Sequence, residues 1–302
     1  VVLHEYAISP QLLQEWASNV RDYREFLREY GLGSPRIPST FPKQKARKLR
    51  SYFLSEGPRD QEPNQARRYL EMVEHLAETT ISREGVSSGQ GNWNADVVDE
   101  NERAPFHVVL SVQPIDTPCN LTPQTMYLGD SAWNHDRQVS VARRYDFISP
   151  LIRDMLRLAT DKVIIIDSYG WNGRAINFIT QVIQDVFRDR LSTCTPSLHL
   201  FYKENSSSPR ADIVRARILD ALPPQANSIE LRVTELREMA GSDVFHNRYI
   251  LTEHGGVTLG HGVDVSEVEN HTDEITLMSR VVYERKWNQY IDNLCFEIVS
   301  QA

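Results

Sequence analysis

The run KVIIID at residues 162–167 constrains the fold of this chain more than any other stretch. A valine and three isoleucines stand in succession and polar residues follow at once, which is typical of a strand buried on both faces. A helical pattern comes next, and the alternation repeats through SLHLFY at 197–202 and SIELRVTEL at 228–236. This β-α-β-α-β order predicts a parallel or mixed sheet flanked by helices, and therefore an α/β fold.

Three more apolar runs follow with no room for helices between them: FHNRYILTE at 245–253, GGVTLGHG at 255–262 and EITLMS at 274–279. We expect each of them to be a strand. After them, apolar residues recur at helical spacing from Tyr283 to Ile298, which predicts a C-terminal helix.

The first 140 residues do not show this alternation of strands and helices and are expected to be mainly helical. Ser9 suits a helix N-cap, and Gly31 suits the C-terminal end of the same helix, while residues 64–78 form a second amphipathic pattern. Residues 85–103 are polar and predict a loop, and FHVVLSV at 106–112 predicts a strand.

We therefore expect two domains. Residues 1–140 form a mainly helical N-terminal domain, and residues 141–302 form an α/β domain resting on a mixed sheet.

Composition limits the class of protein. The chain contains 33 Lys and Arg and 41 Asp and Glu, which gives a net charge of −8. This charge argues against a protein that binds nucleic acid over its whole surface. No run of 18 apolar residues occurs, which predicts no membrane span. Three isolated cysteines, at positions 119, 194 and 295, indicate reduced thiols in a cytoplasmic protein and no zinc site.

One segment is locally basic. No acidic residue occurs between Ser34 and Ser55. Either this segment is a solvated helix start, or it contacts a nucleic-acid backbone and gives the N-terminal domain a role in binding. Its cations are Lys43, Lys45, Arg47, Lys48 and Arg50, with Arg36 just before them.

The expected strand 245–253 carries unusual chemistry. Alternation along a strand places His246 and Arg248 side by side on one face. A guanidinium holds phosphate oxygens in a fork, and an imidazole attacks phosphorus or moves a proton. Gly255 and Gly256 then allow a tight turn, and Gly260 permits close approach of the backbone to an anion.

This pattern resembles the phospholipase D superfamily, whose motif is His-x-Lys, four residues, Asp, six residues and Gly-Ser-x-Asn. His246 stands at the histidine, Arg248 at the lysine, Glu253 at the aspartate and Gly260 at the glycine. The resemblance implies that a carboxylate about 28 residues after the histidine orients the imidazole, and Glu274 stands at that offset.

The sequence departs from the family motif at two phosphate-contacting positions. His261 and Val263 replace the serine and the asparagine. We expect His261 to contact phosphate itself, and Asp264 to reach the site through a one-residue bulge.

The resemblance implies two histidines per site, one that attacks phosphorus and one that protonates the leaving oxygen. No convincing second motif is found: His135 and Arg137 have the spacing without the carboxylate, and His107 lacks the cation. We therefore expect a homodimer that brings two copies of His246 together across a twofold axis. No metal or other cofactor is expected, because the spacings of His254, His261 and His271 match no common ligand signature.

The preferred interpretation is a metal-independent phosphodiesterase that cuts DNA or RNA through a phosphohistidine, in a setting such as defence against phage. The N-terminal domain then binds nucleic acid or a partner such as an ATPase or helicase. A phospholipase is the enzymatic alternative. In a different class, His246 and Arg248 form a satisfied polar pair in a catalytically inactive subunit that binds phosphate or nucleic acid.

Overall fold

The computed structural model describes residues 2–57, 62–86, 91–128, 132–226, 228–240, 244–266, 268 and 270–302. The chain divides into two compact units. The N-terminal unit is Leu3–Asp136, and the C-terminal unit is Arg137–Ala302 together with Val1–Val2. The division falls close to the expected boundary after residue 140.

A small parallel sheet forms the centre of the N-terminal unit. Its strands follow the order β2-β1-β3-β4, and neighbouring strands pair in parallel. They are β1 (His4–Ile8), β2 (Arg36–Pro38), β3 (Val108–Leu110) and β4 (Asn120–Leu121). The helices of the unit are α1 (Pro10–Ser18), α2 (Val20–Glu29), α3 (Ala46–Glu56), α4 (Pro63–Glu78) and α5 (Trp93–Arg103).

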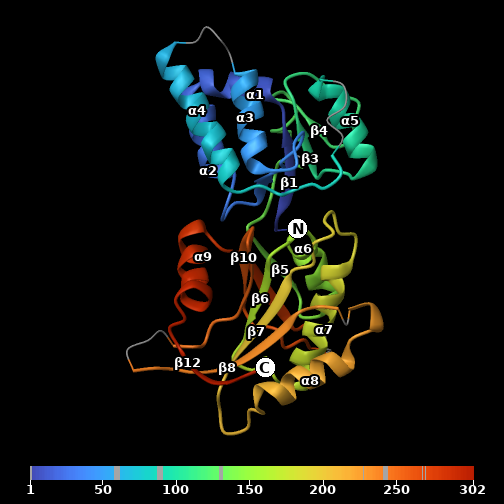
Figure 1. Cartoon of the computed structure of the whole chain (residues 1–302), viewed down its shortest axis with the longest axis vertical. Helices are drawn as coiled ribbons and strands as arrows, with labels where there is room; N and C mark the ends of the chain where they lie inside the picture. Colours follow the sequence, from blue (N-terminus) through green and yellow to red (C-terminus); the bar gives the residue numbers. More distant parts are fainter. Residues whose placement is uncertain are drawn as a thin grey trace. The chain divides into compact units, whose positions relative to one another are not determined.

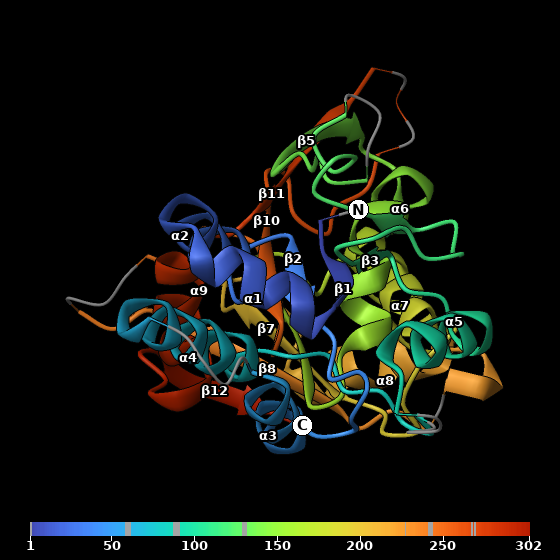
Figure 2. The same ribbon diagram turned by 90° about the horizontal axis from the view of Figure 1, so that it is seen from above.

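Helices cover both faces of this sheet, with α1 to α4 gathered on one side and α5 on the other (Figures 1 and 2). The alternation along β1 explains the two layers. Tyr6 and Ile8 enter the core formed with α1 to α4, whereas Ala7 enters the core formed with α5. Most residues in regular structure are helical, as expected, but the sheet that organises them was not predicted from the sequence.

Two helix predictions in this unit were wrong. The single helix expected between Ser9 and Gly31 is broken at Asn19, whose extended backbone ends α1 and whose side chain accepts a hydrogen bond from the amide of Arg21 at 2.9 Å. In addition, the region 85–103, expected to be a loop, contains α5.

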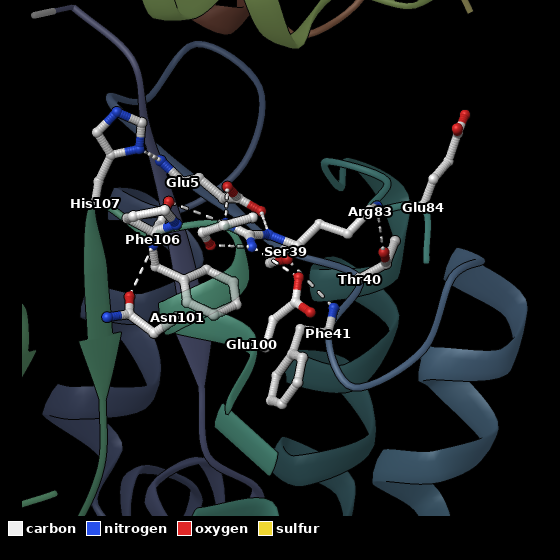
Figure 3. A network of polar contacts seen from close by, with 12 residues as sticks. Glu5, Ser39, Thr40, Phe41, Arg83, Glu84, Glu100, Asn101, Phe106 and His107 are labelled. Atoms are coloured by element: carbon white, nitrogen blue, oxygen red, sulfur yellow. Dashed lines mark hydrogen bonds and ion pairs between the residues drawn. The ribbon is translucent and has the colours of Figure 1, made fainter. Parts of the chain in front are cut away.

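A buried ion-pair network fixes α5 to the sheet (Figure 3). The guanidinium of Arg83 is fully buried and donates to both carboxylate oxygens of Glu5 on β1, each at 2.7 Å. It also donates to Glu100 on α5 at 2.9 Å and lies over the ring of Phe106 at 3.6 Å. Burial disfavours the charge on Arg83, but Glu5 and Glu100 outweigh this effect and raise the pKa of the guanidinium.

The C-terminal unit contains the predicted mixed sheet, and the α/β fold is confirmed. The strand order is β12-β8-β7-β6-β9-β10-β11-β5. Strands β6, β7 and β8 run parallel, and the remaining pairs are antiparallel. The strands are β5 (Gln138–Ala142), β6 (Lys162–Ile166), β7 (Ser197–Lys203), β8 (Leu231–Arg237), β9 (Tyr249–Thr252), β10 (Gly255–Leu259), β11 (Thr272–Leu277) and β12 (Glu297–Gln301).

Helices α6, α7 and α8 lie on one face of this sheet and α9 lies on the other (Figures 1 and 2). Within the described ranges, no helix is both long and apolar enough to cross a lipid bilayer. The helices are α6 (Tyr145–Leu158), α7 (Gly173–Phe187), α8 (Ala211–Ala221) and α9 (Arg280–Trp287), with a 3-10 turn at Pro224–Ala226 and a π turn at Asn288–Asp292.

Two element boundaries differ from the expectation. Strand β9 begins only at Tyr249, so His246 and Arg248 lie before the strand and not within it. The C-terminal helix ends at Trp287, and Ile298 belongs to the edge strand β12, where it is half exposed.

Candidate functional site

Strand register brings Arg248 and Asp167 to one edge of the C-terminal sheet. Strands β6 and β9 are antiparallel with Ile166 opposite Tyr249, so the next residues outward, Asp167 and Arg248, stand at the same edge. The amide of Leu259, the last residue of β10, donates to the carbonyl of Arg248 at 3.1 Å. The loop that follows β10 therefore begins beside Arg248.

Arg248 is held at this edge by two contacts. Its Nη1 donates to the carbonyl oxygen of Gly260 at 3.1 Å, and its Nε lies 3.7 Å from Oδ2 of Asp167. The side chain is 22% exposed. In the described part of the chain no residue accepts a hydrogen bond from Nη2, so this nitrogen is available to a ligand.

Gly262 allows Arg248 and Asp167 to approach each other. Its φ is 76°, and a Cβ there would lie 2.0 Å from Oδ2 of Asp167 and 2.2 Å from Cδ of Arg248. Only glycine fits both the backbone conformation and the space.

Asp167 is the buried carboxylate of the site. Burial raises the pKa of Asp167, while hydrogen bonds from the amides of Tyr169 (2.7 Å) and Val263 (2.9 Å), and the charge of Arg248, oppose that rise. Val263, at the position that we aligned with the asparagine of the motif, is buried. Its backbone amide, and not its side chain, forms the hydrogen bond with Asp167.

His246 lies in the turn that precedes β9. Its ring is exposed to solvent, and its amide donates to the carbonyl of Val244 at 3.0 Å. The predicted acid partner does not contact it. Glu274 points to the exposed face of β11 and accepts a hydrogen bond from Gln138 on β5.

The neighbouring carboxylate, Asp273, faces the site instead. It is buried, and its Oδ1 accepts the amide of His261 at 2.9 Å and lies 3.5 Å from Nδ1 of the same residue. The chain thus contains an imidazole next to a buried acid, but the pair is His261 with Asp273, not His246 with Glu274. Asp273 is only 1% exposed. Gly260 leaves room for it, since a Cβ there would stand 2.7 Å from its Oδ1.

Asp264, expected to reach the phosphate site, contacts two arginine side chains of the same unit. Its Oδ2 accepts Nη2 of Arg143 at 2.8 Å, its carbonyl accepts Nε of Arg143 at 2.6 Å, and its Oδ1 lies 3.7 Å from Arg174. The carboxylate therefore positions two arginines that the sequence analysis missed. Asn172, Gly173 and Arg174, at the start of α7, line an open hollow beside it.

An exposed aromatic ring stands at the same edge. Tyr169 is 53% exposed, and its amide is bonded to Asp167, so the ring projects from the turn that carries the buried carboxylate. An exposed tyrosine ring is a surface on which a nucleic-acid base stacks well.

The other motif residues lie at the opposite end of β9. Glu253 accepts hydrogen bonds from the amide of Thr160 and, at 3.0 Å, from that of Asp161, which anchors the chain before β6. Gly255 has a φ of 147°, and a Cβ on Gly256 would lie 2.4 Å from the side chain of Leu251. These three motif positions shape the β9–β10 turn and lie away from Arg248.

The remaining histidines do not join the site. His254 is buried and contacts the carbonyl of Leu158 at 3.2 Å, and His271 contacts Ser266 at 2.9 Å. His135, in the N-terminal unit, contacts the hydroxyl of Tyr6 at 2.6 Å, and burial together with nearby His4 and Arg36 lowers its pKa to about 3. Across the residues that the structure describes, no group of three His, Cys, Asp or Glu side chains could hold a metal ion.

The basic segment of the N-terminal unit lies at the start of α3. Lys45, Arg47 and Lys48 are exposed, and Lys43, Lys45 and Lys48 line a hollow of about 400 Å³. Arg50 differs from the others because the N–H of its Nε is shared between the two carboxylate oxygens of Glu74 on α4, at 2.8 and 2.9 Å. Lys43 is half-buried and its Nζ lies 4.9 Å from the centre of the Tyr52 ring, so three of the five predicted cations, Lys45, Arg47 and Lys48, are exposed.

No family model matches this sequence, and no curated protein matches it. Among solved structures, a match is TrmBL2, described as an archaeal chromatin protein that shows a novel mode of DNA binding. The TM-score is 0.31 and the identity 14%, over 55% of this chain and about half, 53%, of that chain.

Proposed function

We propose that the C-terminal unit binds the phosphodiester backbone of a nucleic acid at the sheet edge formed by Asp167, Arg248 and the loop after β10. The observation that carries this proposal is the arrangement of Arg248. Two of its nitrogens are directed at the protein, which fixes the guanidinium, and Nη2 remains available for a phosphate oxygen.

Neighbouring groups supply the rest of the surface. Arg174 is 70% exposed at the start of α7, where free amides also favour an anion. His261 and His246 present exposed imidazoles, and Tyr169 offers a ring for base stacking. Stacking on a single tyrosine favours an unpaired strand. In the N-terminal unit, the basic segment at the start of α3 offers a separate surface for backbone phosphates.

Fluorescence anisotropy of a labelled single-stranded oligonucleotide with the full chain tests this proposal. We expect Arg248→Gln to weaken binding roughly tenfold, the effect of losing one charge-assisted hydrogen bond. Because Arg248 also contacts Asp167, circular dichroism must show that this variant is folded. Arg174→Gln, whose side chain is largely exposed, tests the same edge without that risk.

The matched control is Arg232→Gln on β8, where an exposed arginine of the same unit pairs with Glu230. It removes the same charge at another place. Equal weakening by Arg232→Gln and Arg248→Gln would show that binding depends on overall charge, and unchanged binding by both edge variants would reject the site.

Hydrolysis is the second candidate function, and the exposed ring of His246 favours it. Among the residues described, no side chain forms a hydrogen bond with that ring. In this reaction the imidazole of His246 forms an N–P bond while the P–O bond to the leaving nucleotide breaks. The His246 of a second copy of this chain protonates the leaving oxygen, and water then cleaves the N–P bond.

Incubation with plasmid and single-stranded DNA or RNA in EDTA separates hydrolysis from binding alone. The enzyme hypothesis predicts cleavage without metal, loss of cleavage in His246→Ala, and a dimer by light scattering. His261→Ala tests whether the acid-paired imidazole is the required one. Binding without cleavage of any nucleic acid leaves the chain as a binding subunit.

A further inference from the structure

The loop after β10 brings an exposed imidazole next to a buried acid. The side chain of His261 is 57% exposed, whereas that of Asp273 on β11 is fully buried. Nδ1 of His261 lies 3.5 Å from Oδ1 of Asp273, and the backbone amide of His261 donates to the same oxygen at 2.9 Å. Nδ1 therefore faces the acid, and the rest of the ring is open to a ligand.

The carboxylate of Asp273 has one oxygen to spare. Its Oδ1 accepts the amides of His261 and Glu274, the latter at 2.8 Å. Across the residues that the structure describes, no group donates to Oδ2, and no basic side chain other than His261 pairs with this carboxylate. A buried carboxylate in this state lacks a counter-ion. A protonated His261 that donates from Nδ1 supplies both the missing hydrogen bond and the balancing charge.

The main chain fixes this pair. A Cβ on Gly260 would lie 2.7 Å from Oδ1 of Asp273, so the glycine leaves the carboxylate its place under the loop. The amide of Gly260 donates to the carbonyl of Glu274 at 3.2 Å, which ties the loop to β11. The position of His261 beside Asp273 therefore follows from backbone contacts of its neighbours.

The same loop takes part in the proposed phosphate site. Arg248 donates to the carbonyl of Gly260 at 3.1 Å, and His261 is the next residue along the loop. His246 stands two residues before Arg248, which limits the separation of their Cα atoms to about 7 Å. A phosphodiester held by Nη2 of Arg248 therefore lies next to both segments that carry an exposed imidazole.

We propose that His261 is the general acid of this site and that Asp273 is its positioning residue. This inference rests on the hydrolysis proposed above. It differs from that scheme in one respect, because His261 of the same chain takes the place of the second copy of His246. The site is then complete within one chain.

Each proton in the reaction has a place. The imidazole of His246 forms an N–P bond, and as the P–O bond breaks, Nε2 of protonated His261 gives its proton to the leaving oxygen. The neutral ring of His261 then takes a proton from the water that attacks phosphorus, and the electron pair of the broken N–P bond returns to His246. Asp273 accepts from Nδ1 throughout, which keeps Nε2 directed at the substrate.

A sulfur leaving group tests the role of His261. A thiolate leaves without a proton, so a strand with sulfur at the leaving position does not need the acid. The full chain is incubated in EDTA with a single-stranded oligonucleotide and with two analogues that carry sulfur at the 5′ or the 3′ bridging position. We expect His261→Ala to slow cleavage of the all-oxygen strand about 100-fold or more, but cleavage of one sulfur strand less than about fivefold. His246→Ala should abolish cleavage of every strand.

Asp273→Asn tests the positioning role, since it keeps Oδ1 as an acceptor and removes the charge. It should lower kcat on the all-oxygen strand about tenfold or more, leave KM unchanged and spare the same sulfur strand. Retained cleavage of that strand also shows that each variant is folded. The matched control is His271→Ala, an exposed histidine that contacts Ser266, and it should cleave as the wild type does.

Mixing His246→Ala with His261→Ala tests whether one chain holds the whole site. We expect the mixture to stay inactive on the all-oxygen strand, and regained activity would overturn the assignment. Equal losses on oxygen and sulfur strands, or no loss, in His261→Ala would also overturn it while cleavage by the wild type stands. If the wild type cleaves no strand, hydrolysis fails together with this inference, and anisotropy shows whether binding remains.

Discussion

Gly262 lies between Arg248 and Asp167 with a φ of 76° and no room for a Cβ. We predict that Gly262→Ala lowers the free energy of unfolding of the C-terminal unit by more than about 2 kcal/mol, because it adds backbone strain and displaces a buried carboxylate. Chemical denaturation followed by circular dichroism measures this loss. The matched control is Gly173→Ala at the start of α7, where nothing lies within 4 Å of the added Cβ. That change should stay within about 0.5 kcal/mol of wild type. Equal effects at both positions would contradict the crowding around Gly262.

The histidine His199 on β7 makes the stability of the fold depend on pH. Burial, and to a lesser extent Arg232, lowers the pKa of His199 to about 4, and its Nε2 contacts the hydroxyl of Thr234 at 2.8 Å. The unfolded chain therefore binds a proton near pH 6.5 that the folded chain binds only near pH 4. The stability due to neutral His199 is present above pH 6.5 and is lost as the pH falls from 6.5 toward 4.

Between pH 7 and pH 4.5 we expect this residue to account for about 2 kcal/mol of lost stability. Denaturation of wild type and His199→Gln at both pH values measures it, and the variant should show the smaller loss. Identical losses in the two proteins would show that His199 titrates normally in the folded state.

At the level of secondary-structure elements, Arg83 joins β1 to α5 through Glu5 and Glu100 (Figure 3). We predict that Arg83→Met destabilises the N-terminal unit by about 3–5 kcal/mol, since it leaves two buried carboxylates without a counter-ion. Arg50→Met is the matched control. Arg50 makes a similar fork with Glu74, but the pair is exposed, and its loss should be much smaller. Urea denaturation of both variants tests the difference, and losses of similar size would count against a stabilising role for the buried network.

The same network explains which elements the sequence did not reveal. Strand β1 contains the buried Glu5, and α5 buries Asp96, Glu100 and Asn101. Polar residues at core positions remove the apolar periodicity from which helices and strands are predicted. By contrast, β6 and β7 bury apolar residues almost throughout. Strand β8 and helix α7 bury some polar residues as well but keep enough apolar ones that all four elements were predicted correctly from their patterns.

The error at Glu274 has a different physical origin. Glu274 was chosen because it stands 28 residues after His246. A count of residues does not say to which face of a strand a side chain points, because side chains alternate between the two faces. Ile275 and Leu277 are buried, so alternation directs Asp273 inward and Glu274 outward. Reading the phase of β11 from its own apolar residues would have identified Asp273. The position of Asp167 beside Arg248 depends on the pairing of β6 with β9, which no local pattern specifies.

At the scale of the whole molecule, the basic segment at the start of α3 should affect how strongly nucleic-acid affinity depends on salt concentration. If Lys43, Lys45 and Lys48 contact backbone phosphates, changing all three to glutamine should reduce the slope of log affinity against log salt by about 2, at about 0.7 for each single-strand contact. Anisotropy titrations at several salt concentrations measure the slope. An unchanged slope would identify this segment as a solvated start of α3.

The central claim is that nucleic acid binds at the sheet edge that carries Asp167 and Arg248. The most direct test is photo-crosslinking of a single-stranded oligonucleotide containing 5-bromouracil to the full chain, with the linked peptides identified by mass spectrometry. The account predicts a crosslink at Tyr169, which stands exposed at this edge, and its loss in Tyr169→Ala. Specific crosslinks confined to other parts of the chain, with none to residues 167–174 or 244–264, would contradict it.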